Sequence, residues 1–153
     1  MSAYIMPYAD ITIVRAFAGA LQSIHTDYRL DMCDFLSKAF STESFNRFEQ
    51  DHTLFSQGWH CIAGKMLEEI KTKGESVKPI EDIKYLYGDE PVAYWLGYVI
   101  MYWKIKEEIT DGQFFSEFSL SDIYWAYDIL HTQSVDYAID YIKAEYRTVH
   151  EDI

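Results

Sequence analysis

Residues 92–103, Val-Ala-Tyr-Trp-Leu-Gly-Tyr-Val-Ile-Met-Tyr-Trp, form a run of twelve residues without a charged side chain. The run is shorter than the stretch of about 20 residues that crosses a bilayer. It is longer than an ordinary strand and contains no turn signal, which favours a helix. Asp89 offers an N-cap, and Glu90 and Pro91 suit a first helical turn. A helix that is apolar on nearly every side must be wrapped by other elements, so the run predicts a central aromatic helix over about residues 90–109.

Apolar residues recur at helical spacing along most of the chain, and polar capping residues such as Asp31 and Ser134 separate the segments. Short connections without a long alternating stretch indicate an all-α fold. We expect a compact bundle of about six to eight helices. It would comprise an N-terminal helical subdomain (1–76), an irregular connector (77–89) and an acidic C-terminal helical subdomain (90–153), together forming one compact unit.

Two glycines mark expected helix ends. Gly74 follows a predicted helix over residues 58–73, where a residue without a Cβ suits the C′ position. After the central helix, the polar residues 104–108 are expected to return the chain to water, and Asp111-Gly112 is expected to stop it.

The net charge of −12 is unevenly distributed. Residues 1–80 hold 8 Lys and Arg against 10 Asp and Glu, whereas residues 81–153 hold 5 against 15, so the two parts carry −2 and −10. Such a balance opposes nonspecific binding to DNA or to an anionic membrane. It favours either a simply soluble exterior or a basic protein partner. Hydrophobic residues make up 49% of the chain, which argues against intrinsic disorder.

The chain offers few signals for a cofactor or metal. Its two cysteines, Cys33 and Cys61, make neither a disulfide framework nor a metal site, and the five histidines lack zinc-like spacing. A phosphate-cradling loop is also missing from the sequence. We therefore expect no cofactor, no metal and a cytoplasmic location with reduced thiols.

Residues 30–50 resemble the helix-turn-helix of phage-repressor-type domains, in which an apolar residue followed by Glu, here Phe48-Glu49, closes the recognition helix. This resemblance implies a transcriptional regulator as the alternative function. The expected recognition helix carries Glu43, Arg47 and Glu49, however, which is a poor surface for phosphates.

A third alternative is a hydrolase or transferase built on Asp128 and His131. The two residues are three positions apart, so they share a helix face and can form a pair for general-base chemistry. The competing interpretation is that His131 binds backbone carbonyls near a helix C-terminus. No nucleophile or glycine-rich oxyanion turn accompanies the pair in the sequence.

Eight carboxylates flank the aromatic helix and are the candidate partner-binding residues. They are Glu107, Glu108, Asp111, Glu117, Asp122, Asp128, Asp136 and Asp140. The sequence also contains 13 Tyr and 4 Trp. Acidic side chains mixed with aromatic ones imitate a nucleic-acid backbone toward a basic groove. A solvated bundle exterior without a partner is the alternative explanation.

Four segments carry a wider resemblance: Ala16-Phe17-Ala18, Phe45-x-x-Phe48-Glu49, Pro91-x-x-Tyr94-Trp95-x-Gly97-Tyr98 and Leu130-His131-Thr132-Gln133. Along most of its length the chain resembles a family of small uncharacterised proteins from gut Clostridia and their mobile elements. A related family of unknown function shares the Tyr-Asp-x-Leu-His-Thr-Gln motif. The resemblance implies a toxin–antitoxin or phage-conflict context and supplies no catalytic residues. The glycine usual after Phe-Glu is replaced here by Gln50-Asp51.

These patterns lead to one hypothesis. The sequence predicts a non-catalytic inhibitor, of antitoxin, immunity or anti-CRISPR type, that binds a toxin or a nucleic-acid-handling defence enzyme. Its acidic, aromatic face would occlude a basic surface of that partner. The expected partner is a basic or nucleic-acid-binding protein, and we expect no direct contact with nucleic acid or with a membrane. A homodimer of this chain is an open alternative.

Overall fold

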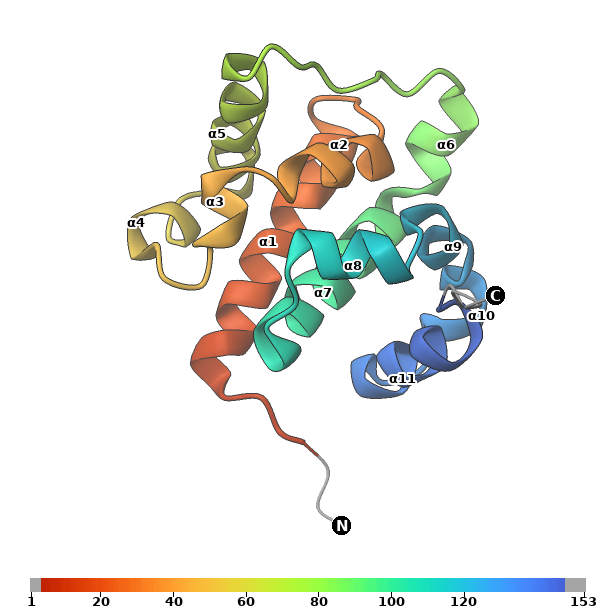
Figure 1. The fold of residues 1–153 in the computed structure, drawn as a ribbon. Coiled ribbons are helices and arrows are strands. Elements are labelled where there is room, and N and C mark those ends of the chain that lie inside the picture. The colour runs from red at the N-terminus through yellow and green to blue at the C-terminus, as the bar shows by residue number, and fades with distance from the viewer. Residues whose placement is uncertain (1–3, 148–153) are drawn as a thin grey trace, which may run out of the picture.

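The structure is a computed structural model that describes residues 4–147, except for the side chains of Ile83, Tyr87 and Asp111. Within these residues the chain forms eleven helical segments (Figure 1). They are α1 (Tyr8–Thr26), α2 (Met32–Ala39), α3 (Glu43–Asn46), α4 (His52–Phe55), α5 (Trp59–Thr72), α6 (Ile83–Gly88), α7 (Glu90–Glu107), α8 (Asp111–Glu117), α9 (Leu120–Trp125), α10 (Tyr127–Leu130) and α11 (Val135–Glu145).

The all-α prediction is confirmed. The described residues contain no strand, and an isolated antiparallel bridge joins Leu30 to Pro79. The number of helices exceeds the expected six to eight. One reason is that α4 and α10 are single turns of four residues, too short for hydrophobic periodicity to reveal.

Helix α7 contains the whole uncharged run but ends at Glu107, two residues before the predicted position. It stops because Glu108 adopts the left-handed conformation, with φ of 52°. The expected stop at Asp111-Gly112 is wrong, since these residues begin α8. There Thr110 and Gln113 form a capping box, which satisfies two otherwise unpaired amide groups of the first turn.

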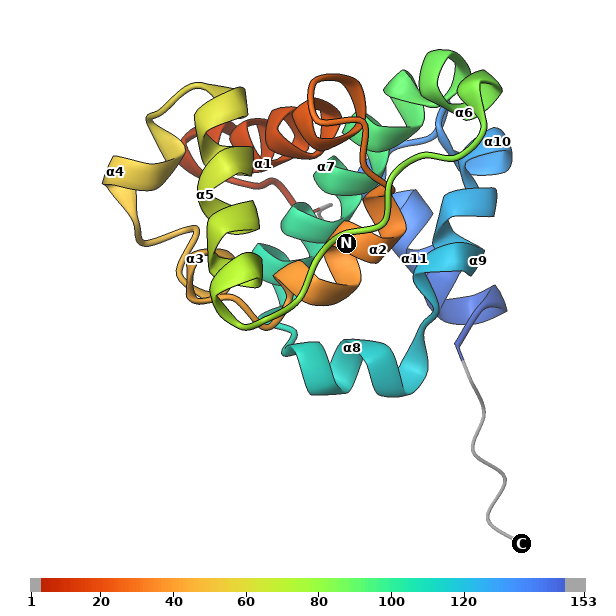
Figure 2. The ribbon, with the colours of Figure 1, turned by 90° about the horizontal axis from the view of Figure 1, so that it is seen from above.

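Helices α1 and α7 lie side by side in the body of the molecule, as Figures 1 and 2 both show. Small residues allow the two backbones to approach closely at their crossing. A Cβ atom placed on Gly97 would lie 3.0 Å from Cα of Ala18 and 3.1 Å from Cβ of Leu21. Leu21 and Leu96 are fully buried in the surrounding core.

The two expected subdomains contribute to one continuous core, which extends from Met6 on the N-terminal arm to Ile142 on α11. Residues 77–89 link the two parts but are only partly irregular, because residues 83–88 form α6. Figure 2 shows this connection passing over α2. The buried imidazole of His25 places its Nε2 atom 2.8 Å from the carbonyl oxygen of Leu86 and so ties α6 to α1.

Lys104 differs from the sequence expectation, because its side chain is only 7% exposed instead of returning to water. Its ammonium lies 2.6 Å from a carboxylate oxygen of Glu49 and 3.4 Å from the carbonyl oxygen of Asn46. The partly buried carboxylate compensates the charge that α7 carries into the interior.

Candidate partner-binding surface

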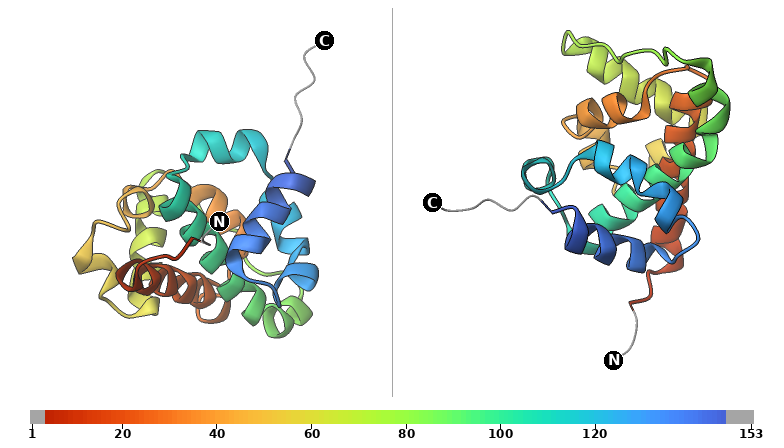
Figure 3. Two further views of the ribbon diagram at one scale, coloured as in Figure 1. Left: turned by 90° about the horizontal axis from the view of Figure 1, so that it is seen from below. Right: turned by 90° about the vertical axis from the view of Figure 1, so that its right-hand side faces the viewer.

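Helix α11 forms one side of the bundle together with α9 and α10, as the blue helices in Figure 3 show. Ser134 caps α11 by accepting a hydrogen bond from the amide of Tyr137. Three apolar residues, Ala138, Ile139 and Ile142, are fully buried on its inner face. At helical spacing this leaves Tyr137 and Asp140 on the opposite face, with the half-buried Tyr141 at its edge against the core.

Asp136 sits at the edge of α11 and connects it to α7. It accepts hydrogen bonds from the hydroxyl of Tyr102, at 3.0 and 3.2 Å, and from the ammonium of Lys106, at 2.7 Å. Burial and then the bond to Asp136 raise the pKa of Tyr102. The same carboxylate raises the pKa of Lys106, with further contributions from the charges of Asp140 and Glu107. Asp136 is therefore a structural link between two helices as well as a predicted partner-binding residue.

Two more of the predicted carboxylates form ion pairs within the chain. Glu107 binds Lys143, and a carboxylate oxygen of Glu117 lies 3.6 Å from Nε of Arg147. The cations of these pairs also approach aromatic rings, with Lys143 over Trp103 and Arg147 over Phe118. These pairs join α7 and α8 to α11 and the residues that follow it.

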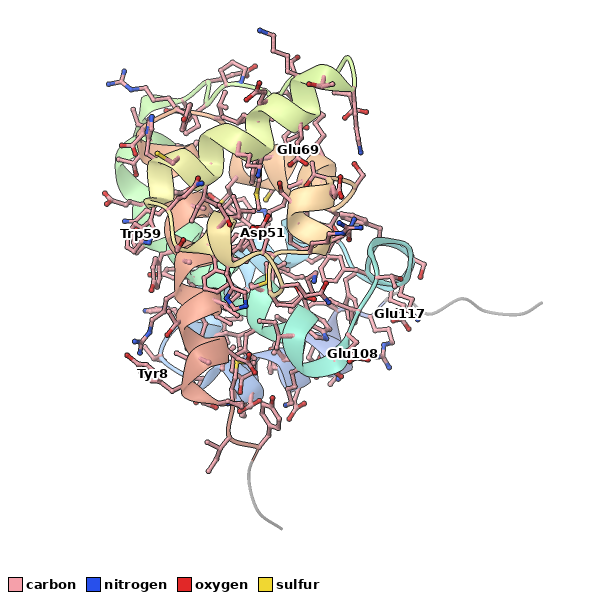
Figure 4. All side chains as sticks on the ribbon, turned by 90° about the vertical axis from the view of Figure 1, so that its left-hand side faces the viewer. Tyr8, Asp51, Trp59, Glu69, Glu108 and Glu117 are labelled. Carbon is pink, nitrogen blue, oxygen red and sulfur yellow. The ribbon has the colours of Figure 1, made fainter. Side chains whose placement is uncertain are left out.

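The other predicted carboxylates lie on different elements. Asp122, on α9, and Asp140, on α11, are exposed and have no ion pair among the described residues. Glu108, just after α7, and Asp128, on α10, are also exposed and have no ion pair within residues 4–147. Figure 4 shows Glu108 and Glu117 on the side of the molecule where α7 ends and α8 lies, far from Glu69 on α5. The side chain of Asp111 lies outside the described residues.

The Lys and Arg residues after position 80 all form ion pairs with carboxylates. Each of the five has a carboxylate within 4.0 Å, and they are Lys84, Lys104, Lys106, Lys143 and Arg147. Each of these five cations is thus already paired with a carboxylate, and the carboxylates of residues 81–147 that form no ion pair keep their negative charge.

Carboxylates and tyrosines meet on α11 in a patch that we call the α11 surface. Tyr137 stacks on Tyr141 with ring centroids 6.4 Å apart, and Tyr141 lies 6.1 Å from Tyr146. Burial raises the pKa of Tyr146, and the charges of Tyr141, Asp122 and Glu145 add to the shift. The α11 surface comprises Asp122, Tyr137, Asp140, Tyr141, Glu145 and Tyr146. The sequence analysis identified Asp122 and Asp140 but missed Glu145 and the row of tyrosines. The spacing of four residues between Tyr137 and Tyr141, which places them on neighbouring turns of one helix face, could have indicated the row.

Asp128 and His131 do not form the pair considered for general-base chemistry. Nδ1 of His131 lies 2.8 Å from the carbonyl oxygen of Tyr127, and the imidazole stacks on the ring of Tyr127 at 4.4 Å. Asp128 is exposed in the first turn of α10. The arrangement matches the competing interpretation, in which His131 binds a carbonyl at the end of a helical turn.

Residues 30–50 contain α2 and α3, but α3 is a single turn whose Ser44 and Phe45 are buried. A recognition helix must present several exposed side chains to a major groove. Phe48 is also buried, and Glu49 is used in the ion pair with Lys104. The features that resemble a helix-turn-helix therefore serve the core and its buried charge in this structure.

A further polar group joins the end of α1 to the start of α5, and sequence reasoning missed it. Ser23 donates a hydrogen bond of 2.6 Å to Asp27, and Nδ1 of His60 lies 3.4 Å from the same carboxylate oxygen. Tyr28 stacks on His60 at 4.6 Å. The bond from Ser23 lowers the pKa of Asp27. Ser23 thus donates to the carboxylate of Asp27 instead of to the imidazole, and the hydroxyl oxygen of Tyr28 lies 3.2 Å from Nε2 of His60.

Two further features of the structure bear on other classes of function. Among the described residues, no group of three or more His, Cys, Asp or Glu side chains gathers in a way that could hold a metal ion. Across residues 4–147, every helix falls short of the length and apolarity that a membrane crossing requires.

Comparison with protein-family models, with curated proteins and with solved structures finds no match to this chain. The resemblance to proteins of clostridial mobile elements therefore stays a prediction. The function has to be argued from the surface itself.

Proposed function

We propose that the protein is a non-catalytic inhibitor that binds a toxin or a nucleic-acid-handling bacterial defence enzyme and occludes a basic surface on it. The observation that carries this proposal is the α11 surface, where three tyrosines in a row lie among carboxylates that form no ion pair within residues 4–147. In the proposal α7 is the centre of the bundle, and the protein acts in the cytoplasm. The partner is a basic protein, neither nucleic acid nor a membrane.

The composition of the α11 surface suits this role. Tyr137 is 52% exposed, and its ring stacks on Tyr141, so the pair offers contact area in a fixed orientation. Tyrosine is among the residues that contribute most to binding energy at interfaces, because a large ring is buried at little cost in conformational entropy. Asp140 and Glu145 are exposed beside these rings. Their charges would steer a cationic partner and fix its orientation.

Charge elsewhere in the chain supports the same direction of binding. Because the five Lys and Arg residues after position 80 are engaged in ion pairs, a cationic partner meets few repelling groups near α11. Asp136 and Glu107 are partly neutralised by Lys106 and Lys143. In this proposal their main contribution is to hold α11 in place, while Asp122, Asp140 and Glu145 face the partner.

The test compares two double variants that each remove two negative charges. Asp140→Asn with Glu145→Gln alters the α11 surface, whereas Glu68→Gln with Glu75→Gln alters exposed carboxylates of the N-terminal part. The tagged proteins are used to capture material from a bacterial lysate that contains nucleic-acid-handling defence enzymes. The association rate of a retained protein is then measured at about 50 mM and 300 mM salt, a range over which the Debye length falls substantially.

We expect the first double variant to lower the association rate about tenfold at low salt and the second to leave it nearly unchanged. The difference should shrink at high salt because screening weakens steering. Retention of nucleic acid alone, or an association rate indifferent to ionic strength, would contradict the proposal. An equal loss in both double variants would locate the effect in net charge and would contradict the role of the α11 surface.

A further inference from the structure

A hollow of about 540 Å³ opens between the end of α1, the start of α2, the connector, α6 and α9. Its size lies within the usual range for small-molecule sites. Backbone hydrogen bonds fix the connector against the α1–α2 turn, from the amide of Asp31 to the carbonyl of Lys78 and from the amide of Ile80 to the carbonyl of Arg29. The bond between His25 and Leu86 holds α6 in position. The walls of the hollow are therefore attached to the core at several points.

The hollow carries a net negative charge. Four carboxylates line it, those of Asp31, Glu81, Asp82 and Asp89, against the ammonium of one lining lysine, Lys78. Burial opposes ionisation of Asp34, a carboxylate outside the lining, but the hydrogen bonds from the Lys38 ammonium and the Lys78 amide keep its pKa low, and the charge of Lys78 adds a smaller contribution. Glu81 has no ion pair within the described residues.

The charges of Asp31 and Asp89 converge on the thiol of Cys33, which also lines the hollow. Burial is the main cause that raises the pKa of Cys33 to about 12, and both carboxylates add to the shift. The thiol is therefore neutral at physiological pH and adds no charge to the hollow.

Three aromatic side chains complete the lining. Trp125 is 63% exposed and packs edge-on against Tyr124, with ring centroids 5.1 Å apart. Tyr124 donates a hydrogen bond to Asp89, which fixes both groups. Tyr85 is 38% exposed, and the ammonium of Lys84 lies 4.9 Å from the centroid of its ring. Lys84 lies outside the lining, but its ammonium shows that an alkylammonium group can lie against the ring of Tyr85 and 4.0 Å from a carboxylate oxygen of Asp82.

We propose that this hollow, the ammonium pocket, binds a primary alkylammonium group between Trp125, Tyr124 and the carboxylates of Glu81 and Asp89. The group can be presented by a free diamine or by a lysine side chain of another protein. Aromatic faces and carboxylates together favour a cation with an apolar stem, since the stem packs on the rings while the charge is neutralised. The pocket is separate from the α11 surface, so it does not rest on the proposed function.

The test uses the full chain and follows the backbone amide signals of residues 78–89 and 121–125 by NMR during titration. The probes are 1,5-diaminopentane, its uncharged analogue 1-pentanol, and a short peptide with one central lysine. We expect the diamine and the peptide to shift these signals with saturation and the alcohol to leave them in place. Tighter binding of the peptide would identify a protein side chain as the natural source, and tighter binding of the diamine would identify a free amine.

Four single variants at exposed positions locate the effect. Trp125→Ala and Glu81→Gln change the pocket, and Tyr8→Ala and Glu75→Gln are their matched controls at exposed positions outside both the pocket and the α11 surface. The pocket variants should each weaken diamine binding about five- to tenfold, and the controls should leave it within about twofold. Equal weakening in pocket and control variants would mean diffuse attraction to an acidic protein and would overturn the proposal. Equal shifts with 1-pentanol, or no saturating shift with either amine, would overturn it as well.

Discussion

The two interfaces on either side of α7 are built from different interactions. Toward α1, the helix presents Gly97 and apolar side chains, and the backbones approach so closely that a Cβ on Gly97 would nearly touch Ala18. Toward α11, buried Ile139 and Ile142 form a smaller apolar centre that is bordered by ionised groups such as Lys106 and Asp136. The first interface depends on packing, which pH and salt hardly affect. The second depends in part on charge, so conditions and substitutions should separate the two.

The largest expected effect is at the first interface. Leu21→Ala removes a fully buried side chain that contacts α7 beside Gly97, and it leaves a cavity between two helices that have little room to move. We expect the free energy of unfolding, measured by urea titration, to fall by about 2–5 kcal/mol. The loss should be nearly the same at low and at high salt.

The matched control for this prediction is Tyr137→Ala, which removes a large but half-exposed side chain from the outer face of α11. It should change the free energy of unfolding by no more than about 0.5 kcal/mol. A loss below about 1 kcal/mol for Leu21→Ala would show that the α1–α7 interface relaxes easily, against the close approach at Gly97.

An intermediate effect is expected at the second interface. Asp136→Ala removes the acceptor of both Tyr102 and Lys106, and Tyr102 is almost fully buried. A buried hydroxyl left without its partner costs about 1–2 kcal/mol, and we expect a loss of this size at neutral pH. The urea midpoint would report it.

The same variant should respond differently to alkaline pH. Burial raises the pKa of Tyr102 and the bond to Asp136 raises that of Lys106, from ordinary values of 10.0 and 10.5. Groups with a raised pKa in the folded state contribute stability that is complete below the unfolded value and is lost as the pH rises toward the folded one. The wild-type protein should therefore lose stability above about pH 10, and its advantage over Asp136→Ala should shrink there.

The control for the pH dependence is Asp128→Asn at an exposed carboxylate on α10, which contributes to the pKa of neither Tyr102 nor Lys106. Its difference from the wild type should stay small between neutral and alkaline pH. If the gap between wild type and Asp136→Ala is constant up to about pH 11, the link through Lys106 contributes nothing to stability.

The parts of the fold that could be predicted from the sequence are those encoded by neighbouring residues. The uncharged run predicts α7, and Asp31 and Ser134 cap helices as expected because a cap depends on the three residues that follow it. Gly74 ends α5 with φ of +80°, a conformation that its missing Cβ permits.

The parts that could not be predicted depend on residues far apart in the chain. Glu49 and Lys104 meet across 55 positions, which turns a lysine expected in water into a buried ion pair. Asp136 and Lys106 meet across 30 positions, so a carboxylate predicted to face a partner also joins two helices. Charge counts along the sequence predict how acidic a region is, but only the fold decides which carboxylates are already neutralised.

The smallest expected effect concerns the ion pair between Glu117, at the end of α8, and Arg147, just after α11. This pair lies beside the interface between α7 and α11. The two side chains are 44% and 47% exposed and their charged atoms are 3.6 Å apart, so water and salt screen the attraction. Glu117→Gln should change the thermal midpoint by an amount equivalent to no more than about 0.5 kcal/mol. The cation of Arg147 also lies over the ring of Phe118, 5.6 Å from its centroid, and this contact survives in the variant.

Arg147→Ala separates the charge from the packing at this position. It removes both the ion pair and the contact with Phe118, so it should cost more than Glu117→Gln, and the excess should persist at high salt, where ion pairing is screened. If the two variants lose the same stability and both losses disappear at high salt, charge alone fastens the end of α11. The contrast with the α1–α7 interface would then extend along the whole of the helix. If the excess persists, the second interface is itself divided, with ion pairs on its border and aromatic packing beneath them.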